Sequence, residues 1–211
     1  MPIFQKQQSL NKLSTLLKSK NLRCLLCGNL TFFTLCKACF EDIKIQPKIR
    51  KIDNLKVYSF YDYQDIEYLL HAKYHIIGSK IYKILTSKIN LYLKEILNQP
   101  LRAYGIGIDD KISQKGYAHN AIFLKNLKSL GITPLYHTLL AKNPVSYAGK
   151  DLKFRQNNPR NFYLTQNVEK KEIILIDDII TTGSTLKEAQ KYLYANGANV
   201  LMAFVLSDAK Y

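Results

Sequence analysis

The sequence contains no long hydrophobic segment, which argues against a membrane-spanning helix. Its longest apolar run, Val200–Leu206, has seven residues, whereas a transmembrane helix needs about 20. The N-terminal residues lack the apolar stretch of a secretion signal. Neither an internal repeat nor a low-complexity tract is present. We therefore expect a cytoplasmic protein without a transmembrane segment.

Acidic residues are also scarce. The 211 residues include 16 acidic and 31 basic side chains, for a formal net charge of +15. The basic excess is densest in residues 1–56, which hold 11 of the basic and 3 of the acidic side chains. Such a charge favours contact with nucleic acid or anionic lipid. However, 26 of the basic residues are lysines, whereas sites that read bases or fork phosphates favour arginine, so a compositional bias toward lysine is an equal alternative.

Cysteine is absent outside one short segment, Cys24-x2-Cys27-x8-Cys36-x2-Cys39. Two C-x2-C pairs on a short loop are typical of a tetrahedral zinc site with four thiolate ligands. Four protein ligands leave no open position for a water, so we predict a structural site rather than a catalytic one. A redox pair or idle thiols would leave the clustering of all four cysteines unexplained.

The chain is long enough for one α/β domain with a small appendage. Residues 1–46 are expected to hold an amphipathic helix, docked on the protein or lying on a membrane, and the zinc finger. Residues 47–211 would form the larger domain, after a linker at 41–56. Apolar patterns predict strands at 57–61, 102–108, 135–141, 173–176 and 199–206, and helices at 65–74, 79–97, 117–130 and from 185 to just before Gly197. This alternation predicts an α/β fold with a parallel sheet flanked by helices.

The most informative stretch is a strand, a polar turn and a helix near the C-terminus. Ile173–Ile176 is a β-branched apolar run typical of a buried parallel strand. Asp177 and Asp178 end this run, and Thr181-Thr182-Gly183-Ser184-Thr185 then leads into the helix. Ligands of α/β proteins bind at this carboxyl end of a sheet.

The residue types of this turn suit a sugar phosphate. Free N–H groups at the start of a helix attract an anion, Gly183 permits close approach, and the neighbouring hydroxyls can donate to phosphate oxygens. Asp177 and Asp178 can accept hydrogen bonds from vicinal sugar hydroxyls. The lysine of a P-loop is absent. We predict a ribose 5-phosphate site; the plainer alternative is a turn whose polar side chains only cap the helix.

The stretch 173–185 resembles the PRPP-binding motif of type I phosphoribosyltransferases. Together with the four cysteines, it makes the chain from Cys24 to Ser207 similar to the ComF family of competence proteins. This family joins a four-cysteine zinc finger to a type I phosphoribosyltransferase-like domain. Weaker similarities lie at Lys115-Gly116-Tyr117, where the family has Arg-Gly-Phe, and at Arg155-x2-Asn158, which resembles its R-x2-N segment.

The same comparison shows two departures from the family pattern. The V-P-V-P that opens the family's pyrophosphate loop is replaced by Ile106-Gly107-Ile108-Asp109, and the Asn-Gln that follows Gly-Phe by Ala118-His119. The sugar-phosphate half of the expected site therefore matches the family, whereas the pyrophosphate half is altered.

The resemblance implies roles for individual residues. The ribose hydroxyls of PRPP would be held by Asp177 and Asp178, with a Mg²⁺ ion bridging ribose and pyrophosphate. The 5-phosphate would be held by Thr181, Thr182, Gly183, Ser184 and Thr185. Pyrophosphate would be held by backbone N–H groups of the loop 109–115, which includes Asp109 and Asp110, together with the side chain of Lys111 or Lys115. Arg155, on the irregular stretch 142–161, would close over the site as a lid. No acceptor-binding or catalytic residue is identifiable.

Three functions are compatible with the sequence. The resemblance implies a PRPP-binding competence protein that supports uptake of transforming single-stranded DNA across the inner membrane. Its partners would be that DNA and DNA-uptake proteins, and it would be cytoplasmic or peripheral at the membrane. The second function is an active phosphoribosyltransferase of nucleotide salvage or synthesis. The third is a non-catalytic nucleic-acid-binding protein that keeps the fold as a scaffold.

Overall fold

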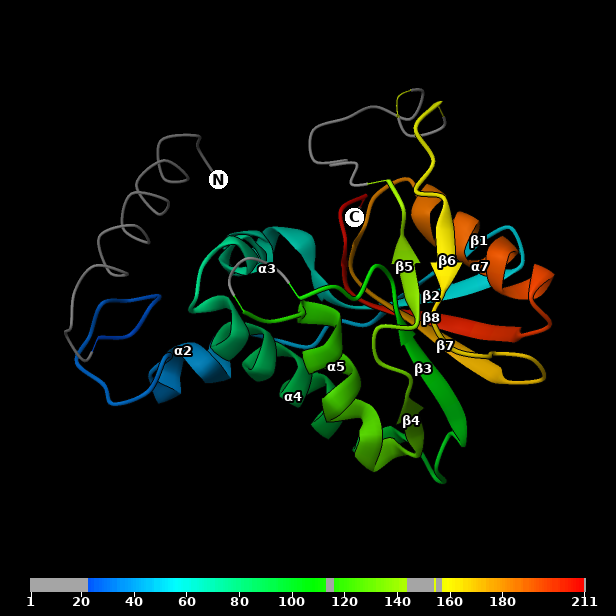
Figure 1. Cartoon of the computed structure of the whole chain (residues 1–211). Helices are drawn as coiled ribbons and strands as arrows, with labels where there is room; N and C mark the ends of the chain where they lie inside the picture. Colours follow the sequence, from blue (N-terminus) through cyan, green and yellow to red (C-terminus); the bar gives the residue numbers. More distant parts are fainter. Residues whose placement is uncertain (1–22, 113–115, 144–153, 155–156, 211) are drawn as a thin grey trace.

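A computed structural model describes residues 23–112, 116–143, 154 and 157–210 (Figure 1). Its main feature is a six-stranded sheet in the order β1-β2-β8-β7-β3-β4. All neighbouring pairs are parallel except β1 and β2. The strands are β1 (Lys48–Ile52), β2 (Leu55–Asp62), β3 (Ala103–Gly107), β4 (Ile132–Pro134), β7 (Glu172–Ile180) and β8 (Asn199–Asp208). The predicted α/β class is confirmed, with an antiparallel strand added at one edge.

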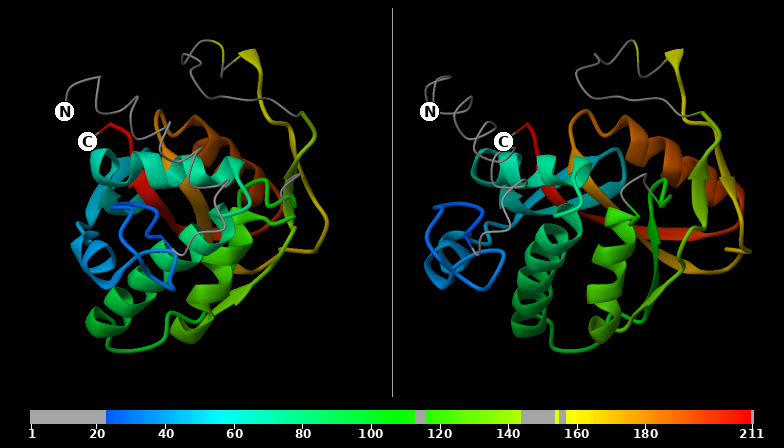
Figure 2. Two further views of the ribbon diagram at one scale, coloured as in Figure 1. Left: turned by 90° about the vertical axis from the view of Figure 1, so that its left-hand side faces the viewer. Right: turned by 60° about the vertical axis from the view of Figure 1, so that its left-hand side comes forward.

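Helices cover both faces of this sheet (Figure 2). One face carries α3 (Tyr63–Leu70), α4 (Gly78–Ile96) and α5 (His119–Leu127), with the 3₁₀ turns η1 (His71–Tyr74) and η2 (Lys128–Leu130). The other face carries α7 (Ser184–Ala195) and a two-stranded antiparallel ribbon of β5 (Leu139–Ala141) and β6 (Phe162–Leu164). The short helix α2 (Lys37–Asp42) belongs to the N-terminal four-cysteine segment.

The core is divided by the sheet into two apolar layers. Along β7, Ile174 and Ile176 pack with α3, α4 and α5, whereas Ile173 and Leu175 pack with α7 and the β5–β6 ribbon. Successive side chains of a strand point to opposite faces, so a strand covered on both sides must be apolar throughout. This requirement explains why the run was recognisable in the sequence.

The linker predicted at 41–56 is wrong, because this stretch contains the edge strand β1. β1 and β2 form a hairpin in which Ile52 pairs with Leu55, and the turn includes Asp53 at a positive φ of 49°. The sequence pattern does not indicate this strand because its apolar side chain faces solvent and its charged side chain faces inward. Ile49 is 63% exposed, whereas the Arg50 side chain is turned inward and is only 13% exposed.

The strand predicted at 135–141 is also wrong in part. The edge of the main sheet is β4, at Ile132–Pro134, and residues 139–141 form β5 in the separate ribbon. The helix predicted at 65–74 ends as α3 at Leu70 and continues as the 3₁₀ turn η1. The long helix predicted at 79–97 is confirmed, and α7 ends just before Gly197, which has a φ of 78°.

Several predictions fall on residues outside the described ranges. The N-terminal amphipathic helix, Lys115 of the pyrophosphate loop and Arg155 of the lid all belong to this group. Within the described ranges, no helix combines the length and apolar character needed to cross a bilayer.

Candidate functional site

The β7–α7 loop, residues 181–183, joins the central strand to the helix that follows it. The sequence predicts that Asp177 and Asp178 end this strand. Instead β7 pairs with β8 as far as Ile180, so both acids lie within the strand. Gly183 has a φ of 83°, and a Cβ atom at this position would lie 2.3 Å from Cδ1 of Ile52. Glycine is therefore required both by the backbone conformation and by the close approach of β1.

The polar groups of this loop are arranged around the start of α7. The Thr182 and Ser184 hydroxyl oxygens lie 3.0 Å apart, and the Ser184 N–H donates to Thr182 Oγ1 over 3.4 Å. The first N–H groups of a helix have no partner within the helix and carry the positive end of its dipole. The loop therefore has the chemical character of an anion site.

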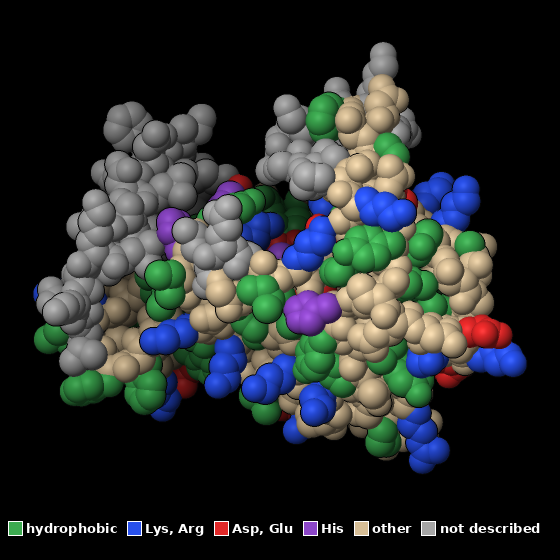
Figure 3. All heavy atoms as spheres, viewed as in Figure 1, with side chains coloured by type: hydrophobic (Ala, Val, Ile, Leu, Met, Phe, Trp, Pro, Cys, Tyr) green, Lys and Arg blue, Asp and Glu red, His purple; other side chains and the backbone are tan. Residues whose placement is uncertain are grey.

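An open cavity of about 460 Å³ lies at the carboxyl ends of the strands. Charged side chains and histidine gather in a recess on this face of the molecule (Figure 3). Six of the residues predicted to form the site line the cavity: Asp109, Asp177, Asp178, Thr181, Gly183 and Thr185. The cavity is also lined by Tyr63, Glu67, Leu70, His71, Lys73, Tyr74, Ile108, His119, Arg160, Ile179, Ile180 and Leu186.

Asp178 is buried and already engaged with the helical layer. Its Oδ2 atom lies 2.7 Å from Lys73 Nζ and accepts a hydrogen bond from the Tyr82 hydroxyl over 3.1 Å. His119 Nε2 lies 3.9 Å from the same oxygen. Burial by itself would raise the pKa of Asp178, but the Lys73 ammonium outweighs it and holds that pKa well below its usual range. Asp178 is therefore an anion whose charge is largely balanced.

Asp177 has a different environment, although it is the adjacent residue. Its Oδ1 atom accepts the backbone N–H of Asp178 over 2.9 Å. Burial and the neighbouring Asp178 carboxylate raise the pKa of Asp177 to about 7. Of the two acids, Asp177 is the one whose carboxylate faces the cavity without a close ammonium partner among the described residues.

The predicted pyrophosphate loop is only partly directed to the cavity. Asp109 lines it, and its carboxylate pairs with Arg160 at 3.3 Å and with Lys111 at 3.2 Å. Lys111 also donates to the carbonyl oxygen of Ala141 on β5. Asp110 is buried, and its Oδ2 accepts the backbone N–H of His137 over 3.2 Å. Asp110 and Lys111 thus attach this loop to the β5–β6 ribbon.

Arg160 and His119 line the cavity, but sequence reasoning did not select them. Arg160 lies two residues before β6 and reaches Asp109, which is 51 positions away in the sequence. His119 opens α5, and burial lowers its pKa. Its presence where the family has Asn-Gln was visible in the sequence, whereas nothing local distinguished Arg160 from surface arginines.

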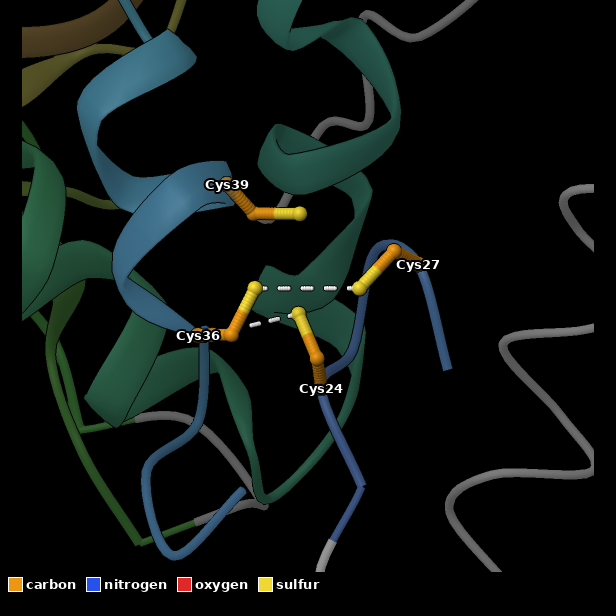
Figure 4. Close-up of side chains that lie close together, drawn as sticks. All are labelled: Cys24, Cys27, Cys36 and Cys39. Carbon is orange, nitrogen blue, oxygen red and sulfur yellow. Dashed lines mark hydrogen bonds between the residues drawn. The ribbon is translucent and has the colours of Figure 1, made fainter. Parts of the chain in front are cut away.

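The four cysteines lie together in what we call the finger, residues 23–43. Their four sulfur atoms all lie within 4.8 Å of one another, and the sulfurs of Cys27 and Cys36 are 3.7 Å apart. Figure 4 shows all four sulfurs converging from the Cys24–Cys27 turn and from the start of α2. A tetrahedral site with Zn–S bonds of 2.3 Å would place its sulfurs about 3.8 Å apart. The arrangement therefore fits a tetrahedral metal ion.

The backbone of the finger supports the anionic form of one thiol. The Cys36 N–H donates to Cys24 Sγ over 3.2 Å. Burial alone would raise the pKa of Cys24, but backbone N–H groups of Cys27 and Cys36 outweigh it and lower that pKa to about 6. Burial and the other thiols raise the pKa of Cys39. Thiolates bind metal ions more tightly than thiols, so the N–H groups favour a bound cation.

The finger is packed against the larger domain. Its buried residues Leu25, Leu35 and Ile43 belong to the same apolar cluster as α3 and α4. Lys88 of α4 donates to the Phe40 carbonyl oxygen over 2.6 Å and lies 4.3 Å from the centre of the Phe40 ring. The stability of the finger and that of the helical layer are therefore linked.

Comparisons with curated proteins give short matches only. No known family model matches the chain. A 63-residue stretch is 40% identical to the transcriptional regulator GfcR of Methanothrix thermoacetophila, over 30% of each chain. A 47-residue stretch is 43% identical to hypoxanthine-guanine phosphoribosyltransferase of Aquifex aeolicus, over 22% of this chain and 26% of that one. The chain thus aligns with less than a third of each of these relatives.

Solved phosphoribosyltransferase structures align over more of the chain, at low identity. Adenine phosphoribosyltransferase from Saccharomyces cerevisiae is 14% identical, over 83% of this chain and 90% of that one, with a TM-score of 0.43. Hypoxanthine phosphoribosyltransferase from Staphylococcus aureus is 16% identical, over 62% and 74%, with a TM-score of 0.36. Function is therefore inferred from the residues of this chain.

Proposed function

We propose that the protein binds PRPP in the cavity at the carboxyl end of β7. One observation carries this proposal: a carboxylate, Asp177, and the anion-binding β7–α7 loop line the same cavity. A ribose 5-phosphate unit needs both an acceptor for its hydroxyls and a cradle for its phosphate. The short match to a phosphoribosyltransferase supports the same ligand class.

The two acids would have different roles in this complex. Asp177 would accept hydrogen bonds from the ribose hydroxyls. Asp178, already bonded to Lys73 and Tyr82, would hold the Lys73 ammonium at the cavity wall, where it would face the anionic ligand. Thr181, Thr185 and the first N–H groups of α7 would bind the 5-phosphate.

The charge of the cavity implies that a divalent cation accompanies the ligand. The lining contains four carboxylates, Glu67, Asp109, Asp177 and Asp178, but only two lysine or arginine side chains, Lys73 and Arg160. PRPP carries several negative charges, so its entry into this lining needs a compensating ion. Mg²⁺, which prefers oxygen ligands and often binds with phosphates, would supply the positive charge. Asp177 offers it an oxygen, and ligand atoms of Asp178 and His119 lie within 4.8 Å of one another and of Asp177.

Calorimetric titration tests this proposal. PRPP with Mg²⁺ is expected to bind the metal-loaded protein, and binding should be lost without Mg²⁺. Asp177→Asn should weaken binding about tenfold or more, because a neutral amide is a poorer acceptor of the hydroxyl hydrogen bonds than a carboxylate. Glu172→Gln is the matched control, because it removes an exposed acid at the opposite end of the same strand.

Two results would contradict the proposal. A folded wild-type protein that does not bind PRPP would exclude this ligand. Equal affinity in the wild type and in Asp177→Asn would place the ligand elsewhere.

We further propose that the biological context is the uptake of single-stranded DNA, as in the ComF family, with zinc as the structural metal of the finger. The surface of the finger supports a nucleic-acid contact. Leu30, Phe32 and Phe33 are 78%, 85% and 76% exposed, and this end of the chain carries the densest positive charge. Exposed aromatic rings suit stacking on unpaired bases. DNA-uptake proteins at the inner membrane would be the partners.

Binding of single-stranded DNA is expected to weaken steeply with salt, because released counterions drive it. The double variant Phe32→Ser/Phe33→Ser should lose roughly thirtyfold or more in affinity, since each of two stacked bases contributes about 1–3 kcal/mol. Leu91→Ser is the control, because it removes an exposed apolar side chain on α4. Fluorescence anisotropy with a labelled oligonucleotide measures the salt dependence and the affinity of each variant. An unchanged affinity in the double variant would remove the finger from the DNA-binding surface.

An active phosphoribosyltransferase is the second candidate function. Its reaction would form a bond from an acceptor nitrogen to the sugar C1 as the bond from C1 to pyrophosphate breaks. Release of pyrophosphate that depends on an added acceptor would identify it. The short matches to transcriptional regulators favour instead a third candidate, a non-catalytic nucleic-acid-binding role for the fold.

A further inference from the structure

Arg50 of the edge strand β1 contacts the outer side of the β7–α7 loop. Its guanidinium donates to the carbonyl oxygen of Thr181 over 2.7 Å and to that of Thr182 over 3.3 Å. Arg50 itself is not among the side chains that line the cavity. It therefore touches the backbone of the candidate phosphate loop without reaching the ligand space.

These two hydrogen bonds determine how the loop presents its N–H groups. In a trans peptide the C=O and the following N–H point in opposite directions. When the carbonyl groups of Thr181 and Thr182 point at Arg50, the N–H groups of Thr182 and Gly183 point away from it. Thr181 and Gly183 line the cavity on that other side, where a phosphate would accept these hydrogen bonds.

The guanidinium is held firmly in this position. Asp208, at the end of β8, pairs with it through both carboxylate oxygens, at 3.1 and 3.2 Å. The Asp208 side chain is 2% exposed, and the Ala209 N–H ties the same segment to the Ile180 carbonyl oxygen over 2.8 Å. Because Asp208 balances the charge of Arg50, the arginine acts on the loop by orientation rather than by attracting an anion.

A second contact from the same hairpin supports this function. Ile52 lies directly against Gly183, which has no Cβ atom to hold it away. At the hairpin turn, Asp53 pairs with Lys187 of α7 at 2.6 Å. The β1–β2 hairpin thus contacts the loop, and the helix that follows it, at three successive places.

We infer that Arg50 is a positioning residue for a phosphate monoester bound at the β7–α7 loop. This inference rests on the proposed PRPP site and adds to it a requirement from a part of the chain that the motif does not include. Arginine is needed because its planar group offers five donors, which can serve two carbonyl oxygens and a carboxylate at once. Lysine has a single ammonium group and cannot span these acceptors in one geometry.

The test compares Arg50→Lys with the wild type, using ribose 5-phosphate as the probe. Calorimetry should show an affinity loss of about tenfold to a hundredfold, the range found for residues that orient metal ligands without touching the metal. Amide NMR should show that ribose 5-phosphate shifts the Thr182 and Gly183 N–H signals in the wild type but much less in the variant. Amide signals elsewhere in the free protein should be unchanged.

Two further variants keep the test decisive. Lys51→Met is the matched control: Lys51 directly follows Arg50 on β1, and its side chain is exposed on the opposite face of the strand. It should bind ribose 5-phosphate like the wild type. Should Arg50→Lys fail to fold, Asp208→Asn loosens the same guanidinium and should weaken binding in the same direction.

The possible outcomes separate this inference from the proposal on which it depends. A folded wild type that binds neither PRPP nor ribose 5-phosphate overturns both. Wild-type binding that Arg50→Lys retains overturns the role of Arg50 and leaves the PRPP site intact. A loss of affinity accompanied by amide shifts across the whole spectrum also overturns it, because it would indicate general destabilisation.

Discussion

Removal of the metal from the four-cysteine site is expected to melt the finger and to lower the thermal unfolding midpoint of the whole chain by roughly 10 °C. The effect should be large because binding of a structural zinc contributes on the order of 10 kcal/mol to the folding of a finger. No disulfide joins these cysteines, so the metal is the expected link between Cys24–Cys27 and Cys36–Cys39.

The loss should extend beyond the finger itself. Leu25, Leu35 and Ile43 are buried in the apolar cluster that includes α3 and α4. Each such side chain contributes about 1.5–3 kcal/mol when it is fully buried. A melted finger would withdraw all three and expose the helices beneath, which explains the expected effect on the larger domain.

Calorimetric melting with and without a strong chelator measures this effect, and metal analysis should give one zinc per chain. Cys27→Ser should reproduce the chelated state. Phe32→Ser is the control, because Phe32 lies on the same short segment but is 85% exposed and is not a ligand. An unchanged unfolding midpoint after complete metal removal would contradict a structural role for zinc.

Exchange of the two adjacent acids for asparagine is expected to change stability in opposite directions. Asp178→Asn should lower the free energy of unfolding by about 3 kcal/mol, because removal of one partner leaves a buried charge uncompensated. That charge belongs to Lys73, whose pKa is raised above its usual value by Asp178 despite burial. Lys73 and Asp178 are separated by 105 positions, so their pair also joins η1 to β7.

Asp177→Asn should instead stabilise the protein above neutral pH. The pKa of Asp177 is raised from 3.8 to about 7 in the folded state, so between these values the folded chain binds more protons than the unfolded chain. Stability therefore falls as pH rises through this window. A neutral asparagine does not have this dependence, so the gain from the substitution should grow from pH 4 to pH 7 and then remain constant.

Denaturant unfolding of both variants at pH 5 and pH 8 makes the comparison. The cost of Asp178→Asn should be present at both values, because its depressed pKa keeps the carboxylate ionised at each. Glu172→Gln, at the exposed end of the same strand, should leave the free energy of unfolding unchanged at both pH values. Equal destabilisation by the two asparagines would contradict the different roles assigned to the two acids.

Features that depend on neighbouring residues could be predicted from the sequence. The long helix α4 was identified because Ile81, Leu85 and Ile89 recur at helical spacing and form its buried face. The cysteine cluster was identified by its spacing alone. The β7–α7 loop was identified because an apolar strand, two acids and a glycine-containing turn follow one another directly.

Features that depend on inverted polarity escaped sequence reasoning. β1 was interpreted as a linker because its apolar Ile49 points to solvent, while Arg50 points inward to Asp208, 158 positions away. The sequence also predicts one strand at 135–141 where the structure has two separate ones, β4 and β5. Each is only three residues long, and they belong to different sheets, which a local apolar pattern does not reveal.

The sequence by itself therefore determined the α/β class, the four clustered thiols and the candidate phosphate loop, because each rests on spacing within one local segment. Tertiary structure decided which of the two acids lacks a close ammonium partner, that Lys73, Tyr82 and His119 surround the other, and that Arg50 orients the loop. The physical reason is that a charge buried far from its partner in sequence is stable only when packing brings the two together. Local pattern contains no information about which distant residue that partner will be.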